Sequence, residues 1–193
     1  EDDFSRVEMN YVEKLGRMAE VKGASALAND LYIRLIIDAE EAKADYAKSP
    51  AWLKSLLQAY ADGINYFLYK NPQVKPALLT HFEPWYPLLW TDGSIGAIST
   101  GDVQEAEAAK FYGLRDGLAV HRPKSVPDEK LTGSNGFAVG PSLSASGNAM
   151  LYINPHVTFY FRPEVHVNSE QGLKVYGAVT WGQFFIYQGF NPY

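Results

Sequence analysis

The stretch Gly133-Ser134-Asn135-Gly136 places a serine directly after a glycine, a pair that can support cleavage of its own peptide bond. A glycine before a serine lets the backbone adopt strained or left-handed conformations. In such a turn the serine hydroxyl can attack the preceding carbonyl carbon, and water then hydrolyses the ester that forms. The new fragment would begin with Ser134, which would carry a hydroxyl and a free α-amine on adjacent carbon atoms. One hypothesis is therefore a self-cleaving bond between Gly133 and Ser134.

A serine at the start of a chain combines a nucleophile and a base in one residue. An α-amine has an unperturbed pKa of about 8, so it can accept the hydroxyl proton near neutral pH, directly or through one water. Such a residue needs no separate histidine–acid pair. A serine hydrolase with a conventional triad is a rival hypothesis, but the sequence has no Gly-x-Ser-x-Gly nucleophile elbow.

The same four residues also have a simpler interpretation, an ordinary β-turn. Asn-Gly between apolar runs is the strongest short-range hairpin signal, and Gly133 and Ser134 would then only lead into the turn. The residues alone leave both interpretations open.

Composition excludes several classes of protein and site. The 193 residues suffice for one sizeable domain with its own core. Cysteine is absent, which excludes disulfides, thiolate metal sites and a thiol nucleophile. The 17 basic residues are scattered and the net charge is −5, which argues against a nucleic-acid surface. No apolar run reaches about 18 residues, so the sequence predicts no membrane span.

The first part of the chain has the periodicity of amphipathic helices. Apolar residues recur at spacings of three and four from Phe4 to Met18, and Gly23 is the predicted end of that helix. The same period predicts a helix from Leu27 to about Ala47. A third helix is predicted from an N-cap at Ser49, with Pro50 at its first position, to the stop at Asn71-Pro72.

Proline and aromatic residues then replace the helical pattern. Residues 72–100 predict an ordered loop held by Trp85, Tyr86 and Trp90. Residues 106–116 predict a short helix. Residues 121–133 are polar and contain two prolines, which is typical of an exposed connector.

After Ser134 the sequence is typical of strands. Residues 144–148 and 168–172 are rich in Gly, Ser and Asn and predict turns between strands. We expect an α+β fold, with 1–100 as a helical region, 101–133 as a connector or spacer, and 134–193 as antiparallel strands. The β-branched and aromatic runs that predict these strands are 136–140, 149–154, 157–167, 173–181 and 183–190.

The segment GSNGFAVGPSLSASGNAMLYINPH, residues 133–156, resembles the start of the β subunit in the penicillin acylase family of N-terminal nucleophile (Ntn) hydrolases. GLKVYGAVTWGQFFIYQGFN is similar to the next family segment. EDDFSRVEMNYVEKLGRMAE and AYADGINYFL are similar to family α-subunit helices. The segments occur in the family order and cover most of the chain, with the nearest resemblance to acyl-homoserine lactone, aculeacin and cephalosporin acylases.

The resemblance implies a role for each of several residues. Gly133–Ser134 would be the autoproteolytic bond and Ser134 the catalytic nucleophile. His156, at the end of Asn-Pro-His, would orient the α-amine of Ser134 or the water that bridges to it. Asn135 and Asn154 would support the surroundings of the nucleophile by hydrogen bonds. Candidates for an apolar acyl pocket, with ordinary core packing as the alternative, are Phe137, Val157 and Phe159.

The resemblance further implies that the chain forms part of an αββα sandwich. It also implies an amidohydrolase that cleaves a linear amide between an apolar acyl group and a polar amine. No cofactor is expected for catalysis, and no metal ligands are expected in this chain. A structural calcium in the complete enzyme would have its ligands beyond Tyr193, as would the oxyanion hole. The remainder of the β subunit is the expected partner, and the expected location is periplasmic or secreted. This chain alone is expected to be an unprocessed or inactive fragment; the alternative is a non-catalytic binding or scaffold module.

Overall fold

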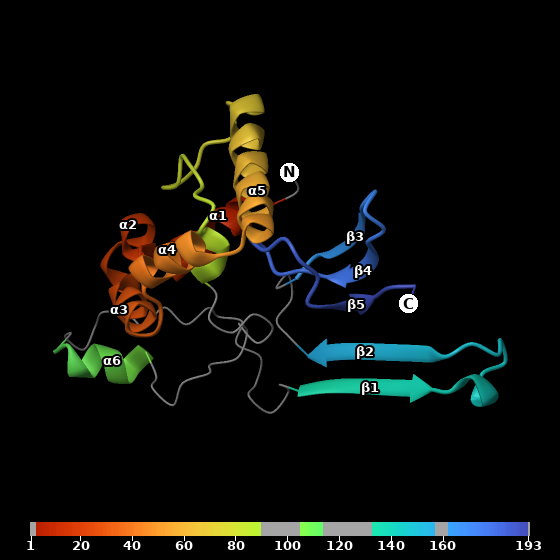
Figure 1. The fold of residues 1–193 in the computed structure, drawn as a ribbon. Coiled ribbons are helices and arrows are strands. Elements are labelled where there is room, and N and C mark those ends of the chain that lie inside the picture. The colour runs from red at the N-terminus through yellow and green to blue at the C-terminus, as the bar shows by residue number, and fades with distance from the viewer. Residues whose placement is uncertain (1–2, 90–104, 114–132, 157–161, 193) are drawn as a thin grey trace. The chain divides into compact units, whose positions relative to one another are not determined.

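The computed structural model describes residues 3–89, 105–113, 133–156 and 162–192. Contacts divide the chain into two compact units, which we call the helical unit (1–121 and 162–193) and the hairpin unit (122–161). The helical unit contains the helices and a three-stranded sheet, and the hairpin unit contains a two-stranded sheet (Figure 1). Helices followed by antiparallel strands confirm the α+β class expected from the sequence.

The helices account for most of the first 111 residues, with breaks that the periodicity did not predict. They are α1 (Phe4–Lys14), α2 (Met18–Lys22), a 3₁₀ turn (Gly23–Ala26), α3 (Leu27–Ile36), α4 (Ala39–Lys48), α5 (Ala51–Lys70), a second 3₁₀ turn (Tyr86–Leu89) and α6 (Glu105–Phe111). α5 confirms the predicted helix at 50–70, and α6 confirms the short helix predicted at 106–116 as far as Phe111. Residues 114–116 lie outside the described residues.

Two predicted helices are each split in two. The first ends at Lys14, because Gly16 has a positive φ of 61°, and a Cβ there would lie 2.7 Å from the side chain of Arg34. The second is interrupted at Ile37, whose backbone is extended, and Asp38 then caps α4 by accepting from the backbone N–H of Glu40 at 2.8 Å. A side chain that satisfies the free N–H groups of a first turn starts a new helix even where the apolar period continues.

The predicted N-cap at Ser49 is wrong. Its hydroxyl donates to the carbonyl of Asp45 at 2.8 Å, so it closes the end of α4. Pro50 occupies the N-cap position of α5, and no side chain caps that helix.

The core of the helical unit joins the helices to the loop that follows α5. Tyr11 and Phe82 meet edge to face, with ring centroids 5.7 Å apart, and Trp85 stands at 89° to Tyr86. Residues 72–89 are therefore an ordered loop with aromatic anchors, as predicted, while Trp90 lies outside the described residues. The buried cluster consists of Tyr11, Val12, Ile33, Ile37, Ala42, Leu79, Phe82, Tyr86 and Leu89.

Two buried carboxylates connect segments of the helical unit through backbone N–H groups. Asp30 of α3 accepts from the N–H groups of Met18 and Ala19, both at 2.7 Å, and so caps α2. Glu8 of α1 is only 2% exposed and accepts from the backbone N–H groups of residues 77, 78 and 79 at 2.7–3.0 Å. Both acids satisfy main-chain donors that would otherwise be buried without partners.

The sheet of the helical unit has the order β3-β4-β5, all antiparallel: β3 (Glu164–Asn168), β4 (Lys174–Ala178) and β5 (Gln188–Phe190). The predicted turn at 168–172 joins β3 to β4. Gly177 lies opposite Gly189, and a Cβ on Gly177 would clash with the backbone oxygen of Gln188 in β5. The two glycines therefore let these strands approach each other closely.

The predicted strand at 183–190 is mostly a loop. Only its last three residues form β5, because the preceding residues dock on the helices. Asn10 of α1 donates to the carbonyl of Trp181 at 2.9 Å, and Gln183 donates to the carbonyl of Pro87 at 3.0 Å. The hydroxyl of Tyr11 donates to the carbonyl of Gly182. These contacts fix the sheet to the helices.

Two buried tyrosine side chains predict that the helical unit loses stability at high pH. Burial raises the pKa of Tyr60 to about 12, and burial together with nearby Tyr60 raises the pKa of Tyr11 well above its usual value. Since the unfolded pKa is about 10, the stabilisation is complete below pH 10 and is lost as pH rises toward 12. We expect the free energy of unfolding to fall across this window, and Tyr60→Phe to reduce the fall. The same pH dependence in Tyr60→Phe and wild type would contradict this.

Candidate functional site

The predicted chemistry lies in a β-hairpin formed by β1 (Gly133–Val139) and β2 (Met150–His156). The strands are antiparallel and in continuous register, from Gly133 opposite His156 to Val139 opposite Met150. The connection contains a 3₁₀ turn and the predicted turn at 144–148, where Gly147 has a φ of 71°. Asn135-Gly136 therefore lies inside a strand, and the interpretation of these residues as an ordinary β-turn is wrong.

Alternation along the strands gives the hairpin two faces. We call one the histidine face, which carries Asn135, Phe137, Val139, Met150, Tyr152, Asn154 and His156. The other is the serine face, which carries Ser134, Gly136, Ala138, Leu151, Ile153 and Pro155. The predicted nucleophile and the predicted histidine thus project from opposite faces of the hairpin.

The histidine face brings together three of the predicted site residues. His156 Nε2 lies 3.2 Å from Asn135 Nδ2 and 3.3 Å from Asn154 Nδ2. A side-chain amide nitrogen can only donate, so Nε2 is the acceptor that the two amides share. The two asparagines therefore hold the imidazole ring of His156 on this face.

Ser134 lies near the start of β1, opposite Pro155, and is exposed. Its backbone nitrogen, which would become the free α-amine after cleavage, lies in the line of the strand between the two faces. Its hydroxyl projects from the serine face, away from the imidazole of His156.

The predicted acyl-pocket residues are only partly described. Phe137 is 63% exposed and contacts the ring of Tyr152 on the histidine face, with ring centroids 5.7 Å apart. Val157 and Phe159 lie outside the described residues. Phe137 is therefore an exposed aromatic side chain of the hairpin, on the same face as His156.

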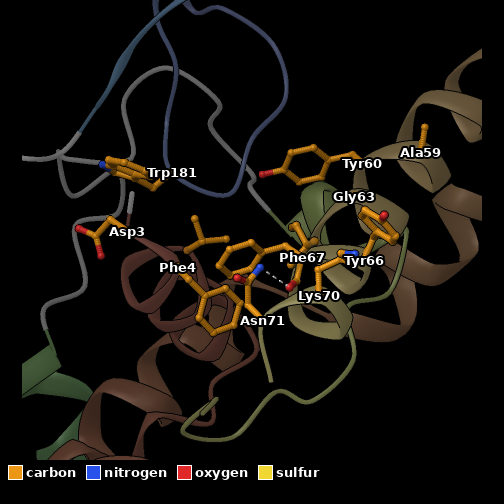
Figure 2. Close-up of a pocket in the computed structure, with 12 residues that line it drawn as sticks. Asp3, Phe4, Ala59, Tyr60, Gly63, Tyr66, Phe67, Lys70, Asn71 and Trp181 are labelled. Atoms are coloured by element: carbon orange, nitrogen blue, oxygen red, sulfur yellow. Dashed lines mark hydrogen bonds between the residues drawn. The ribbon is translucent and has the colours of Figure 1, made fainter. Parts of the chain in front are cut away.

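An apolar cleft of about 740 Å³ lies in the helical unit, between α1, α5 and Trp181. Figure 2 shows Trp181 and Asp3 on one side of it and Ala59, Gly63 and Tyr66 on the other. A Cβ added to Gly63 would meet no atom within 4 Å, so this helical glycine borders open space. Sequence reasoning missed this cleft, because its aromatic residues have the spacing of an ordinary helix core.

The cleft offers binding surface and no obvious catalytic group. Lys70 is among the residues that line it, and the carboxylate of Asp3 is paired with Arg6 at 2.7 Å. In the described ranges, no group of three or more His, Cys, Asp or Glu side chains is placed to hold a metal ion. The hairpin is therefore the candidate site for chemistry.

No helix in the part of the chain that the structure describes is both long and apolar enough to cross a bilayer.

Curated relatives cover most of this chain but a small part of their own length. The chain is 28% identical to the acyl-homoserine lactone acylase PvdQ of Pseudomonas syringae pv. tomato, over 91% of this chain and 25% of that protein. It is 26% identical to the penicillin acylase 2 proenzyme of Pseudomonas sp. (strain SE83), over 82% of this chain and 26% of that protein. The chain therefore spans about a quarter of the length of these relatives. No solved structure gives a significant match.

The family comparison covers every element described above. The model of the penicillin amidase family matches residues 1–193, which include the helical unit, the hairpin and the Gly133–Ser134 bond. The chain belongs to the penicillin amidase family.

Proposed function

We propose that this chain is the self-cleaving part of an amidohydrolase whose nucleophile is Ser134. The observation that carries the proposal is the family match over the whole chain, which includes Gly133-Ser134-Asn135. The relative named a proenzyme adds support, because a proenzyme is a precursor that must be processed.

Self-cleavage needs only the atoms of one peptide bond and one water. Ser134 Oγ forms a bond to the carbonyl carbon of Gly133, and the C–N bond to Ser134 breaks. The released amine takes the hydroxyl proton. Water then hydrolyses the ester, which leaves a carboxylate on Gly133 and both a free hydroxyl and a free α-amine on Ser134.

Substrate hydrolysis repeats the same chemistry on an external amide. The α-amine of Ser134 accepts the proton of Oγ as Oγ attacks the substrate carbonyl, and it returns the proton to the leaving amine. Water releases the acyl group from the ester. His156, held by Asn135 and Asn154, orients the α-amine or its bridging water.

The proposed substrate joins an apolar acyl group to a polar amine. Acyl-homoserine lactones, lipopeptides and β-lactams with an acylated amine have this chemistry, and the names of two relatives include the first and the last class. The remaining β subunit would complete an αββα sandwich, provide oxyanion donors and hold any structural calcium. The proposed location is the periplasm or outside the cell.

Release of a free amine tests this function. The processed full-length gene product is incubated with N-acyl-homoserine lactones of several chain lengths and with phenylacetylated amines, and new primary amine is measured. We expect hydrolysis of at least one class by the wild type and none by Ser134→Ala. Hydrolysis that survives Ser134→Ala would contradict the mechanism. Binding without any turnover would favour the binding or scaffold module.

A further inference from the structure

The sequence of the hairpin shows which opposite pairs of residues exchange backbone hydrogen bonds, a pattern that we call the hydrogen-bonding phase. In such a ladder, opposite residues alternate between pairs that exchange two N–H···O=C bonds and pairs that exchange none. Ser134 lies opposite Pro155, and proline has no N–H to donate. The Ser134–Pro155 pair therefore exchanges no hydrogen bonds, and the adjacent Gly133–His156 pair belongs to the hydrogen-bonded class.

A contact further along the hairpin supports the same phase. A Cβ built on Gly136 would lie 3.6 Å from the carbonyl oxygen of Tyr152, so this carbonyl points from β2 toward β1. Tyr152 lies opposite Phe137, in the same alternate set of pairs as Gly133 and His156. Both observations therefore indicate that the pairs Gly133–His156 and Phe137–Tyr152 exchange hydrogen bonds.

In this phase the carbonyl oxygen of Gly133 points toward the backbone N–H of His156. We infer that this N–H is the donor that stabilises the negative charge on the Gly133 oxygen when Ser134 attacks, an inference that rests on the self-cleavage proposed above. The role belongs to the main chain of His156 and is separate from that of its imidazole, which lies on the histidine face.

The strand geometry also gives the attack its direction. Side chains stand roughly perpendicular to a sheet, so Ser134 Oγ reaches the carbonyl carbon from the serine face, across the plane of the peptide group. As the new C–O bond forms, the carbonyl π electrons move onto the oxygen beside the His156 N–H. When the C–N bond breaks, the nitrogen of Ser134 takes the hydroxyl proton. This nitrogen faces the side of β1 that no described strand covers.

An amide-to-ester change at His156 tests the inference while it keeps the imidazole. The α-hydroxy acid analogue of histidine, placed at position 156 of the full-length chain, replaces only the backbone N–H by oxygen. The matched control is the α-hydroxy analogue of isoleucine at Ile153, whose N–H points away from β1 in this phase. Loss of one oxyanion donor should slow self-cleavage about a hundredfold at position 156, and the control should stay within about twofold of wild type.

Equal cleavage rates for the two esters would overturn the inference and leave self-cleavage intact. A wild-type chain that is never cut would instead refute the proposed function. If the ester at 156 fails to fold, amide hydrogen exchange in the uncut Ser134→Ala chain decides the phase. Slow exchange of the His156 amide is expected, and exchange as fast as in an unstructured peptide would overturn the inference.

Discussion

Replacement of Ser134 by alanine is expected to abolish cleavage at Gly133–Ser134, whereas replacement by cysteine is expected to preserve it. Alanine has no atom that can attack the Gly133 carbonyl, and loss of a catalytic nucleophile typically costs at least about ten-thousandfold in rate. A cysteine thiol can form the corresponding thioester with the same local geometry. Intact mass of each full-length variant, followed over time, measures the cleaved fraction.

Ser142→Ala is the matched control for this experiment. Ser142 is an exposed serine in the connection between β1 and β2. Its replacement removes a serine hydroxyl and leaves the bond between Gly133 and Ser134 unchanged. We expect the control to cleave at the wild-type rate. Cleavage that continues in Ser134→Ala, or that stops equally in Ser142→Ala, would exclude Ser134 as the attacking group.

The second large effect is on stability. Glu8→Gln is expected to lower the free energy of unfolding by about 2–4 kcal/mol, since bonds between charged groups and buried donors contribute about 1.5–3 kcal/mol each. In the wild-type structure the three backbone N–H groups of residues 77–79 donate to the two carboxylate oxygens of Glu8. A glutamine offers one oxygen and turns an NH₂ group toward the other donor. Urea unfolding of the full-length chain measures the loss.

Glu170→Gln makes the same chemical and charge change at an exposed position. Glu170 lies exposed in the turn between β3 and β4, where no residue that the structure describes donates a hydrogen bond to its carboxylate. We expect a change within about 0.5 kcal/mol. A Glu8→Gln chain as stable as Glu170→Gln would show that the carboxylate does not hold the loop.

The local sequence predicted that helices and strands exist better than it predicted the residues at which they begin and end. The 20-residue helix α5 follows from its apolar period and the proline that precedes it. The break between α3 and α4 could not be predicted from the apolar period, because that period continues across residues 37 and 38. The side chain of Asp38 caps α4 and so starts a new helix there. Glu8 and Asp30 read as ordinary polar positions of amphipathic helices, since their partners are backbone groups of distant segments.

The candidate site was predictable as a set of residues but not as an arrangement. Asn135-Gly136 is a turn signal on local grounds, yet pairing of Phe137 with Tyr152 and of Asn135 with Asn154 places it in a strand. Register decides which side chains share a face, and register depends on the partner strand as well as the local sequence. The separation of Ser134 from His156 therefore appears only in the structure.

The most direct test of self-cleavage is N-terminal sequencing, with intact mass, of the purified full-length wild-type gene product. Self-cleavage predicts a second fragment that begins Ser-Asn-Gly-Phe-Ala-Val, with Ser134 as its first residue. A folded product in which the bond between Gly133 and Ser134 stays intact would contradict it. The hairpin would then be a structural element without a nucleophile of this kind, as in a binding or scaffold module.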